Sequence, residues 1–465
     1  MSAATPDAKH SSSPPAPETP DTNRPRFLGR LLPHQHDGVR WLARREADEQ
    51  SPGGILADDM GLGKTVQILA MMCRSPAKTL IVCPKSIVDQ WTHQIASFTD
   101  LEHVHLAASL GSVNDVRRAA ARTQVCVCTY EFLLSFDVSC ASFERIVLDE
   151  AHRIRNTRSK THACIKSIPS RIRWAVTGTP LLSRKRDFDA LVAWISSRAR
   201  VPPSEIMLRR TFDDLGGDRV KLPPCEFVNH VVDLCREEKA AYNRIVESGL
   251  RTKTSSHRPD DDHLLRTLFK LQQCLVSLDF VNESWIGVGT KILKCMDLAA
   301  PKTVRRLLVF THHRNELDVV SAACEMSGCV VETMDGQTSG TQRGNVMRWF
   351  NDTDGTDRRA LVTNLVVGGV GLNLQATDTI IFVSPDWTPS LEMQAVARAH
   401  RIGCSHRVTV HRIIARGTID EHVARMQSRK LDEVAALFDD QRVRKRFGGH
   451  LMDPADVQSI LTPVV

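Results

Sequence analysis

The stretch DDMGLGKT has the residue types and spacing of a loop that binds phosphate. Gly61 and Gly63 would let backbone N–H groups approach a phosphate at the start of a helix. Lys64 would supply a positive charge and Thr65 a hydroxyl for magnesium. The general pattern G-x-x-x-x-G-K-S/T has its first glycine where this chain has Asp58. These residues alone leave three interpretations open: an intact variant loop, a broken loop, or an ordinary glycine-rich turn before a helix.

The stretch VLDEAH (147–152) offers a second element of phosphate chemistry. An apolar run ends in two adjacent carboxylates, of which Asp149 suits magnesium and Glu150 suits a water molecule. By themselves, two adjacent acidic residues after a strand are ordinary surface residues in about half of cases. Because they follow a loop that contains GKT, they favour in-line phosphoryl transfer.

Short apolar runs must form the elements that position these residues. The runs are TLIVCP (79–84), QVCVCTY (124–130), RIVLDE (145–150) and RWAVTGTP (173–180), followed later by RRLLVFT, ALVTN, TIIFVSP and VTVHRII. Continuous β-branched runs separated by helical-length stretches predict parallel sheets covered on both faces, in two α/β domains. Ligands of such sheets bind beyond the carboxyl ends of the strands, where Asp149, Glu150, Thr177 and Thr363 fall.

The pattern predicts the domain organisation. We expect a disordered tail rich in Pro, Ser and Thr (1–25), a first α/β domain (26–202), a mostly helical insertion or bridge (203–290), a second α/β domain (291–435) and a basic tail (436–465). The basic run RVRKRF (442–447) lies in the last of these; its interpretations are a DNA-contacting end, a localisation signal or, most simply, a solvated surface.

Composition limits the class of protein. The chain has 465 residues, 42% of them hydrophobic, which suffices for two domains. A net charge of +7 favours a polyanionic partner only weakly. The 13 cysteines contain no C-x-x-C pair, so neither disulfides nor zinc are expected, and the compartment is expected to be reducing. There is no long apolar run and no signal peptide, so we expect a soluble, non-secreted protein without membrane contact.

Several motifs occur in an order that resembles the Swi/Snf type of superfamily-two helicase-like ATPase, from about residue 30 to 430. They are LLPHQHDGVRWL (31–42, Q motif), GGILADDMGLGKT (53–65, motif I), CPKSIVDQW (83–91, motif Ia), VLDEAH (147–152), TGTP (177–180, motif III), VVGGVGLNLQATDTIIFVSPDWTP (366–389, motif V) and QAVARAHRIG (394–403, motif VI). That family's own motif I has an acid at the position of Asp58, so the resemblance implies an intact loop. It also implies two tandem RecA-like domains.

The resemblance implies a role for each site residue. Gln35 would recognise adenine, the loop Asp58, Asp59, Met60, Gly61, Leu62, Gly63, Lys64 and Thr65 would hold the phosphates of ATP, and Thr65 and Asp149 would hold magnesium. Glu150 would act on the attacking water, while Arg398 and Arg401 would be arginine fingers from the second domain. His152, Thr177, Thr179 and Gln394 would couple hydrolysis to closure, with His152 and Gln394 forming a pair between the domains.

Four residues are expected to contact DNA. Lys85, Ser86, Thr363 and Trp387 would bind mainly to phosphates and therefore without regard to base sequence. For Trp387 the alternative is an aromatic side chain buried beneath a loop.

Within the family, ADDMGLGKT, FERIVLDEAHRIRN and RWAVTGTP look closest to the branch of helicase-like transcription factor, the postreplication-repair translocases and the Lodestar-type termination ATPase. Several members of that branch carry a RING zinc finger between their motor domains. Here the bridge holds only Cys225, Cys235 and Cys274, too few for two zinc sites. LLSRKRDF after TGTP, Val367 and Cys404 depart from the family pattern on surfaces that would couple the domains.

The predicted function is a DNA-dependent ATPase, using ATP and magnesium, that translocates along duplex DNA and remodels or displaces bound protein such as nucleosomes or polymerase. The alternatives are a strand-separating helicase and an ATP-gated DNA-binding protein with little turnover. The expected location is the nucleus, or the host nucleus for a viral protein, with a cytoplasmic DNA compartment as the alternative. The sequence identifies no targeting partner.

Overall fold

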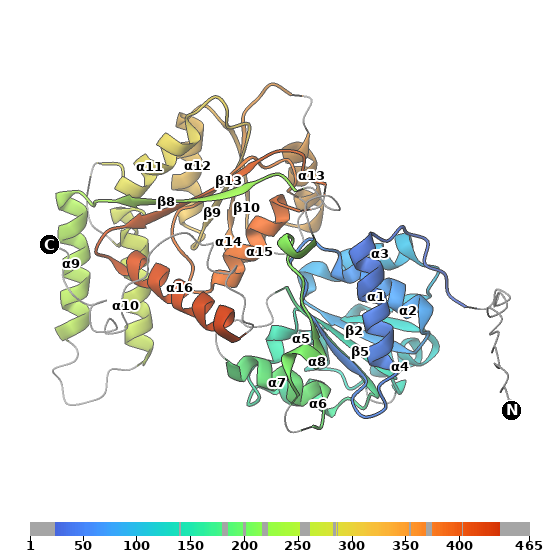
Figure 1. Cartoon of the computed structure of the whole chain (residues 1–465). Helices are drawn as coiled ribbons and strands as arrows, with labels where there is room; N and C mark the ends of the chain where they lie inside the picture. The colour runs from blue at the N-terminus through green and yellow to red at the C-terminus, as the bar shows by residue number, and fades with distance from the viewer. Residues whose placement is uncertain are drawn as a thin grey trace, which may run out of the picture.

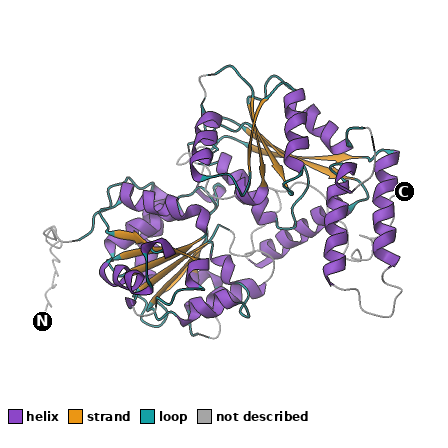
Figure 2. Cartoon of the chain, turned by 180° about the vertical axis from the view of Figure 1, so that it is seen from behind, coloured by secondary structure: helices purple, strands orange, loops and turns teal. Residues whose placement is uncertain are grey.

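The computed structural model describes residues 24–138, 141–178, 185–198, 201–215, 222–251, 261–281, 285, 287–352, 355–368, 374–401 and 403–437. Two parallel sheets, each flanked by helices, form two domains that follow each other along the chain (Figures 1 and 2). The predicted fold class of two parallel-sheet α/β domains is confirmed. Nearly all of the predicted tails 1–25 and 436–465, and Thr179 of the TGTP motif, lie outside the described residues.

The first domain is built on a seven-stranded sheet with the order β3-β4-β2-β5-β6-β1-β7. The strands are β1 (Gly53–Leu56), β2 (Thr79–Cys83), β3 (His103–His105), β4 (Val125–Thr129), β5 (Arg145–Asp149), β6 (Ile172–Val176) and β7 (Met207–Leu208). The helices are α1 (Pro33–Glu46), α2 (Lys64–Arg74), α3 (Val88–Phe98), α4 (Val113–Arg122), α5 (Tyr130–Leu133), α6 (Lys160–Ser167), α7 (Lys185–Ile195) and α8 (Pro203–Ile206). The adjacent strands β2, β5, β6 and β1 place their carboxyl ends at one edge, so the residues that follow them gather there.

The second domain is built on a six-stranded sheet with the order β10-β11-β9-β12-β13-β8. The strands are β8 (Cys225–Val232), β9 (Arg306–Thr311), β10 (Val330–Met334), β11 (Arg359–Asn364), β12 (Thr379–Phe382) and β13 (Val408–Ala415). The helices are α9 (Arg236–Arg251), α10 (Asp261–Cys274), α11 (Thr290–Ala299), α12 (Glu316–Met326), α13 (Gly340–Asn351), α14 (Leu365–Gly368), α15 (Pro389–Ala399) and α16 (Ile419–Leu437). Every strand pairing in both sheets is parallel.

The predicted bridge, expected to be mostly helical, also contributes a strand to each sheet. Its strand β7 completes the first sheet beside β1, and its strand β8 completes the second sheet beside β13. Its helices α9 and α10 pack with α16 around buried Tyr242 and Leu271. The bridge therefore belongs structurally to both domains. Its edge strands escape the apolar-run pattern because β8 alternates between half-buried and exposed residues.

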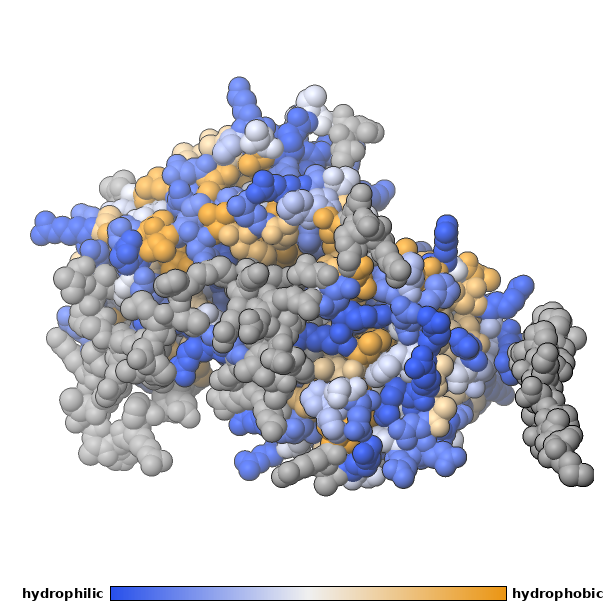
Figure 3. All heavy atoms as spheres, viewed as in Figure 1, coloured by the Kyte–Doolittle hydropathy of each residue, from blue (hydrophilic) through white to orange (hydrophobic). Residues whose placement is uncertain are grey.

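The two domains differ in the hydropathy of the residues on the face seen in Figure 3. On the face seen in Figure 3, hydrophilic residues cover most of the first domain, and hydrophobic residues are more frequent over the second. Leu265 and Phe269 of α10 are about half exposed.

Within the described residues no helix is long and apolar enough to cross a membrane. The described cysteines are free thiols.

A histidine pair joins the edge strand β8 to β13 and makes stability depend on pH. His230 Nε2 and His411 Nδ1 are 2.9 Å apart. Burial, then the neighbouring His230 and Lys294, lower the pKa of His411 to about 4. An unfolded chain, whose histidines titrate near pH ~6.5, therefore takes up this proton first as the pH falls. The stabilising effect of the neutral ring is complete above pH ~6.5 and is lost towards pH ~4.

We expect the melting temperature to fall less steeply between pH 7 and 5 in His411→Gln than in the wild type, because the partly buried ring with its lowered pKa is no longer present. Thermal unfolding by circular dichroism at a series of pH values measures this. The exposed His93 supplies the control, since His93→Gln should leave the slope of the wild type unchanged. If the melting temperatures of His411→Gln and the wild type fell equally steeply with pH, the lowered pKa assigned to His411 would be contradicted.

Candidate functional site

The loop between β1 and α2 has the backbone of an anion-binding turn. Gly61 and Gly63 have φ values of 89° and 78°, a region in which side chains are strained, so glycine is required at both positions. Helix α2 starts directly after Gly63, and its first-turn N–H groups therefore lie at the loop. This geometry favours an intact variant loop among the three interpretations that the sequence left open.

The contacts of Asp58 show how the loop is held, although it lacks the first glycine of the general pattern. Its carboxylate is fully buried and is bound by the Arg210 guanidinium, with Nε at 3.0 Å from Oδ1 and Nη2 on Oδ2. Gln67 of α2 donates to the same carboxylate at 3.0 Å. The prediction that Asp58 takes part in nucleotide binding can therefore apply only to its backbone. Its side chain instead anchors the loop to Arg210 and Gln67.

Lys64 lies inside the loop. Its Nζ donates to the carbonyl oxygens of Asp58 at 2.8 Å and Asp59 at 3.3 Å. Burial lowers the pKa of Lys64, and the carboxylates of Glu150, Asp58 and Asp149 oppose this shift. A phosphate in the loop would compete with the two carbonyl oxygens for the ammonium group.

Motif III lies over the same loop. A Cβ atom placed on Gly178 would stand 2.5 Å from Met60 Cγ and 3.3 Å from Lys64 Nζ, so a side chain at position 178 would displace Met60. Thr177 is fully buried, and its N–H donates to the carbonyl of Leu56 at the end of β1. The backbone after β6 therefore packs directly on the residues predicted to hold phosphate.

Gln35 and His34 of α1 also contact the loop. The Gln35 amide donates to the Leu62 carbonyl at 3.2 Å and accepts from the Leu32 N–H at 2.9 Å. His34 Nε2 lies 3.1 Å from the same Leu62 carbonyl oxygen. Gln35 thus lies beside the loop, but its polar atoms contact backbone, and recognition of adenine by Gln35 stays a prediction.

Asp149 ends β5 beside the loop and is held on two sides. Trp91 Nε1 donates to Oδ2 at 2.7 Å, and the Glu150 N–H donates to Oδ1 at 2.9 Å. Burial, then the neighbouring Glu150 carboxylate, raise the pKa of Asp149 to about 6. A cation at this position would favour the ionised form.

Glu150 lies where the two domains meet. It has a left-handed backbone with a φ of 50°, which is uncommon for a residue with a side chain. His152 Nδ1 lies 3.2 Å from Glu150 Oε2, and Gln394 Nε2 of the second domain donates to the same oxygen at 3.4 Å. His152 and Gln394, predicted as a pair between the domains, thus share one carboxylate oxygen.

The neighbours of Glu150 keep it ionised. Although burial alone would raise the pKa of Glu150, the hydrogen bond and charge of His152 and the charges of Lys64 and Arg398 lower it below its ordinary value. The two adjacent carboxylates therefore have pKa values shifted in opposite directions. Such a separation is typical of acids with different roles in one site.

Motif VI brings two arginines of the second domain to this place. The charge of Arg398 on α15 acts on Glu150. Arg401 Cβ lies 3.2 Å from where a Cβ on Gly61 would stand, so the Arg401 backbone packs against the loop. Arg401 Nε is buried and has no hydrogen-bond partner among the described residues. A buried guanidinium N–H without a partner is costly and fits an anionic group at this position.

These residues fit a nucleoside triphosphate with magnesium. The fit rests on the glycine turns, the Lys64 ammonium inside the loop and the unpaired Arg401 Nε for the phosphates. Hard oxygen donors for magnesium are available from Thr65, at the start of α2, and Asp149. The described residues contain no group of three His, Cys, Asp or Glu that could hold a metal ion by itself. Magnesium would therefore share its coordination with phosphate oxygens and water.

The structure separates the four predicted DNA contacts. Lys85 and Ser86 are exposed in the short 3₁₀ turn after β2. Thr363 is fully buried, and its hydroxyl donates to the Met334 carbonyl at 2.8 Å, so a DNA contact of Thr363 is not supported. The Trp387 side chain is partly buried against the cluster that includes Leu234, which matches the alternative interpretation for this residue.

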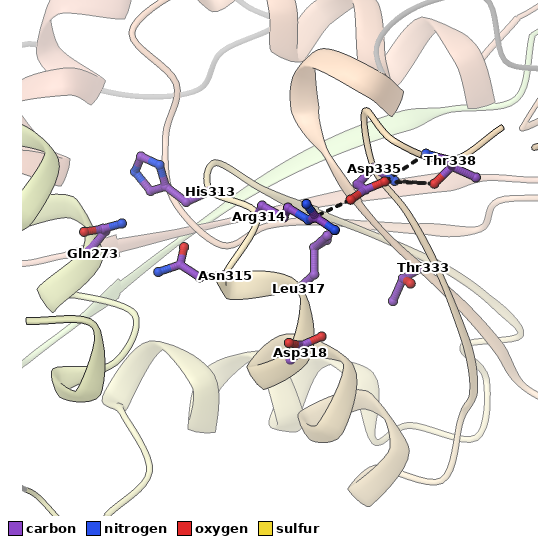
Figure 4. Close-up of a pocket in the computed structure, with 9 residues that line it drawn as sticks. All are labelled: Gln273, His313, Arg314, Asn315, Leu317, Asp318, Thr333, Asp335 and Thr338. Carbon is purple, nitrogen blue, oxygen red and sulfur yellow. Dashed lines mark hydrogen bonds and ion pairs between the residues drawn. The ribbon is translucent and has the colours of Figure 1, made fainter.

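One cavity contains none of the site residues predicted from the sequence. It measures about 690 Å³ and lies at the carboxyl ends of β9 and β10, opposite Gln273 of α10 (Figure 4). Arg314 Nε pairs there with Asp335 Oδ2 at 2.9 Å. The cavity is distinct from the residues around Glu150.

Arg210 is the main residue that the sequence analysis missed. The dipeptide Arg209–Arg210 after an apolar run was the only available signal.

Of the departures from the family pattern, Cys404 is buried and Val367 packs beside the core of the second domain.

Comparisons with known proteins agree with this architecture. Residues 34–200 match the SNF2-related domain and residues 290–403 match the helicase conserved C-terminal domain, together more than half of the chain. A relative from Mus musculus is the SWI/SNF-related matrix-associated actin-dependent regulator of chromatin subfamily A member 1, with 26% identity over 87% of this chain and 43% of its own length. The chain thus spans less than half of that relative.

A second relative is a probable global transactivator of Orgyia pseudotsugata multicapsid polyhedrosis virus, with 25% identity over 88% of this chain and 91% of the viral protein. A solved structure, the Sulfolobus solfataricus SWI2/SNF2 ATPase core in complex with dsDNA, has 22% identity and a TM-score of 0.42 over 94% of this chain and 98% of its own. The two domain matches and these relatives agree with the motifs from residue 31 to 403. The SNF2-related domain, the helicase conserved C-terminal domain and the SWI/SNF-related relative together support a Swi/Snf-type superfamily-two helicase-like ATPase.

Proposed function

We propose that this chain is a DNA-dependent ATPase that translocates along duplex DNA and thereby remodels or displaces DNA-bound protein. The observation that carries the proposal is the meeting of two sets of residues at Glu150: Lys64 from the first domain, Gln394 and Arg398 from the second. A site shared between two domains can link hydrolysis to their relative motion. The family assignment supports the same activity.

In this mechanism the loop N–H groups and Lys64 hold the β- and γ-phosphates, and Gln35 lies towards the adenine side. Magnesium, held by Thr65 and Asp149, would neutralise charge on the phosphates. The ionised Glu150 orients the attacking water, since its carboxylate is charged and is held by His152 and Gln394.

The second domain completes the site. Arg398 and Arg401 stabilise the charge that develops on the γ-phosphate as hydrolysis proceeds. Closure of the site is coupled to movement of the two domains through Gln394 and His152, together with Thr177 and Thr179 of motif III. The domains 26–202 and 291–435 are the proposed moving units, joined by the bridge 203–290.

Duplex DNA is the proposed track, held mainly through its phosphates. Lys85 and Ser86 are the proposed contacts on the first domain, since both are exposed beyond the carboxyl end of β2. The chromatin regulator named above suggests nucleosomes among the displaced proteins, with polymerase as another candidate. We assign the chain to the branch of helicase-like transcription factor and the Lodestar-type ATPase, without ligase activity. We place it in the nucleus, or in the host nucleus if it is viral.

We expect duplex DNA to stimulate ATP hydrolysis and the stimulation to weaken as salt is raised, because phosphate contacts release counterions. ATPase rates without nucleic acid, with single-stranded DNA, duplex DNA, RNA and nucleosomes, each across a salt series, measure this. Equal rates on RNA and duplex DNA would contradict a DNA motor.

Displacement assays separate translocation from its alternatives. A translocase should displace the third strand of a triplex yet leave a forked duplex paired. Unwinding of the fork would establish a helicase instead. DNA binding that depends on ATP, with little turnover and no displacement, would establish an ATP-gated binding protein.

A further inference from the structure

The chain that leads from the first domain to the second runs alongside the phosphate-binding loop. Strand β7 pairs with β1, with Met207 opposite Ile55. The pairing continues past the end of β1, because the Ala57 N–H donates to the Leu208 carbonyl at 2.7 Å and the Asp59 N–H donates to the Arg210 carbonyl at 2.8 Å. The first residues of the loop are therefore held as an extension of the sheet.

The side chain of Arg210 adds a second set of contacts. Its guanidinium binds both oxygens of Asp58, donates to Gln67 Oε1 at 2.8 Å, and donates to the His34 carbonyl. One side chain thus joins the loop, helix α2 and helix α1. A Cβ on Gly38 would stand 2.8 Å from Arg210 Nη2, so α1 leaves no spare room around the guanidinium.

The charge and shape of Arg210 both matter at this position. The Asp58 side chain is fully inaccessible and the Arg210 side chain is 14% exposed, so the pair is largely shielded from water. A buried carboxylate is stable only when it is paired and hydrogen-bonded. The planar fork of arginine can bind two carboxylate oxygens and a third acceptor at once, which the single ammonium of lysine cannot do.

We propose that Arg210 is the positioning residue of the phosphate-binding loop: through Asp58 and Gln67 it holds the loop in the shape that receives a triphosphate. Arg210 acts through these residues and does not contact nucleotide. The inference rests on the proposed ATP site. It explains why this chain has an acid at position 58, since the carboxylate is the attachment point for an arginine 152 residues away.

The test is ATP affinity in the absence of DNA, measured with a fluorescent ATP analogue, for wild type and Arg210→Lys. We expect about a tenfold loss of affinity, comparable to the loss of one well-placed hydrogen bond to a charged group. The affinity is measured well below the melting temperature of each variant, so that only folded protein is compared.

Arg145→Lys is the matched control. Arg145 is also fully buried and binds a carboxylate with two nitrogens, Nε and Nη2 each 2.6 Å from an oxygen of Glu46. Arg145 begins β5, at the end of the sheet away from the loop. Its substitution should lower the melting temperature and leave ATP affinity unchanged. If Arg210 only stabilised the fold, Arg210→Lys would likewise lower the melting temperature and leave ATP affinity unchanged.

Asp58→Asn keeps the shape of the side chain and removes its charge, and serves as a second variant if Arg210→Lys does not fold. It should lose affinity to a similar extent, and the double variant should lose little more, because both changes break one unit. Unchanged affinity in both single variants would overturn the inference while leaving the proposed function intact. Wild-type protein that bound no ATP would overturn both. Wild-type protein that bound ATP without DNA-stimulated turnover would overturn the proposed function alone.

Discussion

Replacing Arg401 by Ala is expected to lower DNA-stimulated ATP turnover by about 10³- to 10⁵-fold and to leave ATP affinity without DNA nearly unchanged. The guanidinium comes from the second domain, and its buried Nε has no hydrogen-bond partner among the described residues. An arginine finger acts on charge that develops during the reaction, so its removal affects the rate far more than binding. Ala retains the Cβ atom that packs against Gly61, which preserves the contact between the domains.

The measurement pairs nucleotide affinity with turnover on duplex DNA for wild type, Arg401→Ala and Arg401→Lys. Lys should restore little activity, because a point charge lacks the planar fork of arginine. Arg407→Ala is the control, since Arg407 belongs to the same domain and its side chain is 60% exposed. Turnover near the wild-type rate in Arg401→Ala would show that the second domain does not complete the site.

Replacing Glu150 by Gln is expected to stop the reaction after ATP has bound, with turnover lowered by about 10²- to 10⁴-fold, the usual contribution of a general base. The charges of Lys64 and Arg398 help to keep Glu150 ionised, and Gln cannot take over that charge. Lys64→Ala should also abolish turnover, but through weaker binding, because it removes the ammonium from the loop.

A fluorescent ATP analogue and a phosphate-release assay distinguish the two variants. Glu150→Gln should bind the analogue and release no phosphate, whereas Lys64→Ala should bind it weakly. Glu131→Gln makes the same substitution at a side chain that is 58% exposed and should behave as wild type. Substantial phosphate release by Glu150→Gln would assign the water to another residue.

The sequence alone predicted the central strands of both sheets and the residues at their carboxyl ends. Strands β2, β4 and β5 are buried on both faces, and such strands form continuous apolar runs that can be recognised locally. The family resemblance predicted a pair of His152 and Gln394 between the domains, and the structure places both side chains beside the same oxygen of Glu150.

Edge strands and side-chain partners depended on the tertiary structure. Strands β8 and β10 alternate or are largely exposed, so no apolar run marks them. The burial of Thr363 and the pairing of Asp58 with Arg210 depend on which distant segments pack together. Local residue types therefore determined the strands, the turns and the chemistry available to this protein. The path of the chain alone decided whether a polar side chain faces a ligand or supports the fold, because a buried carboxylate or hydroxyl takes whichever partner the packing brings within hydrogen-bond distance.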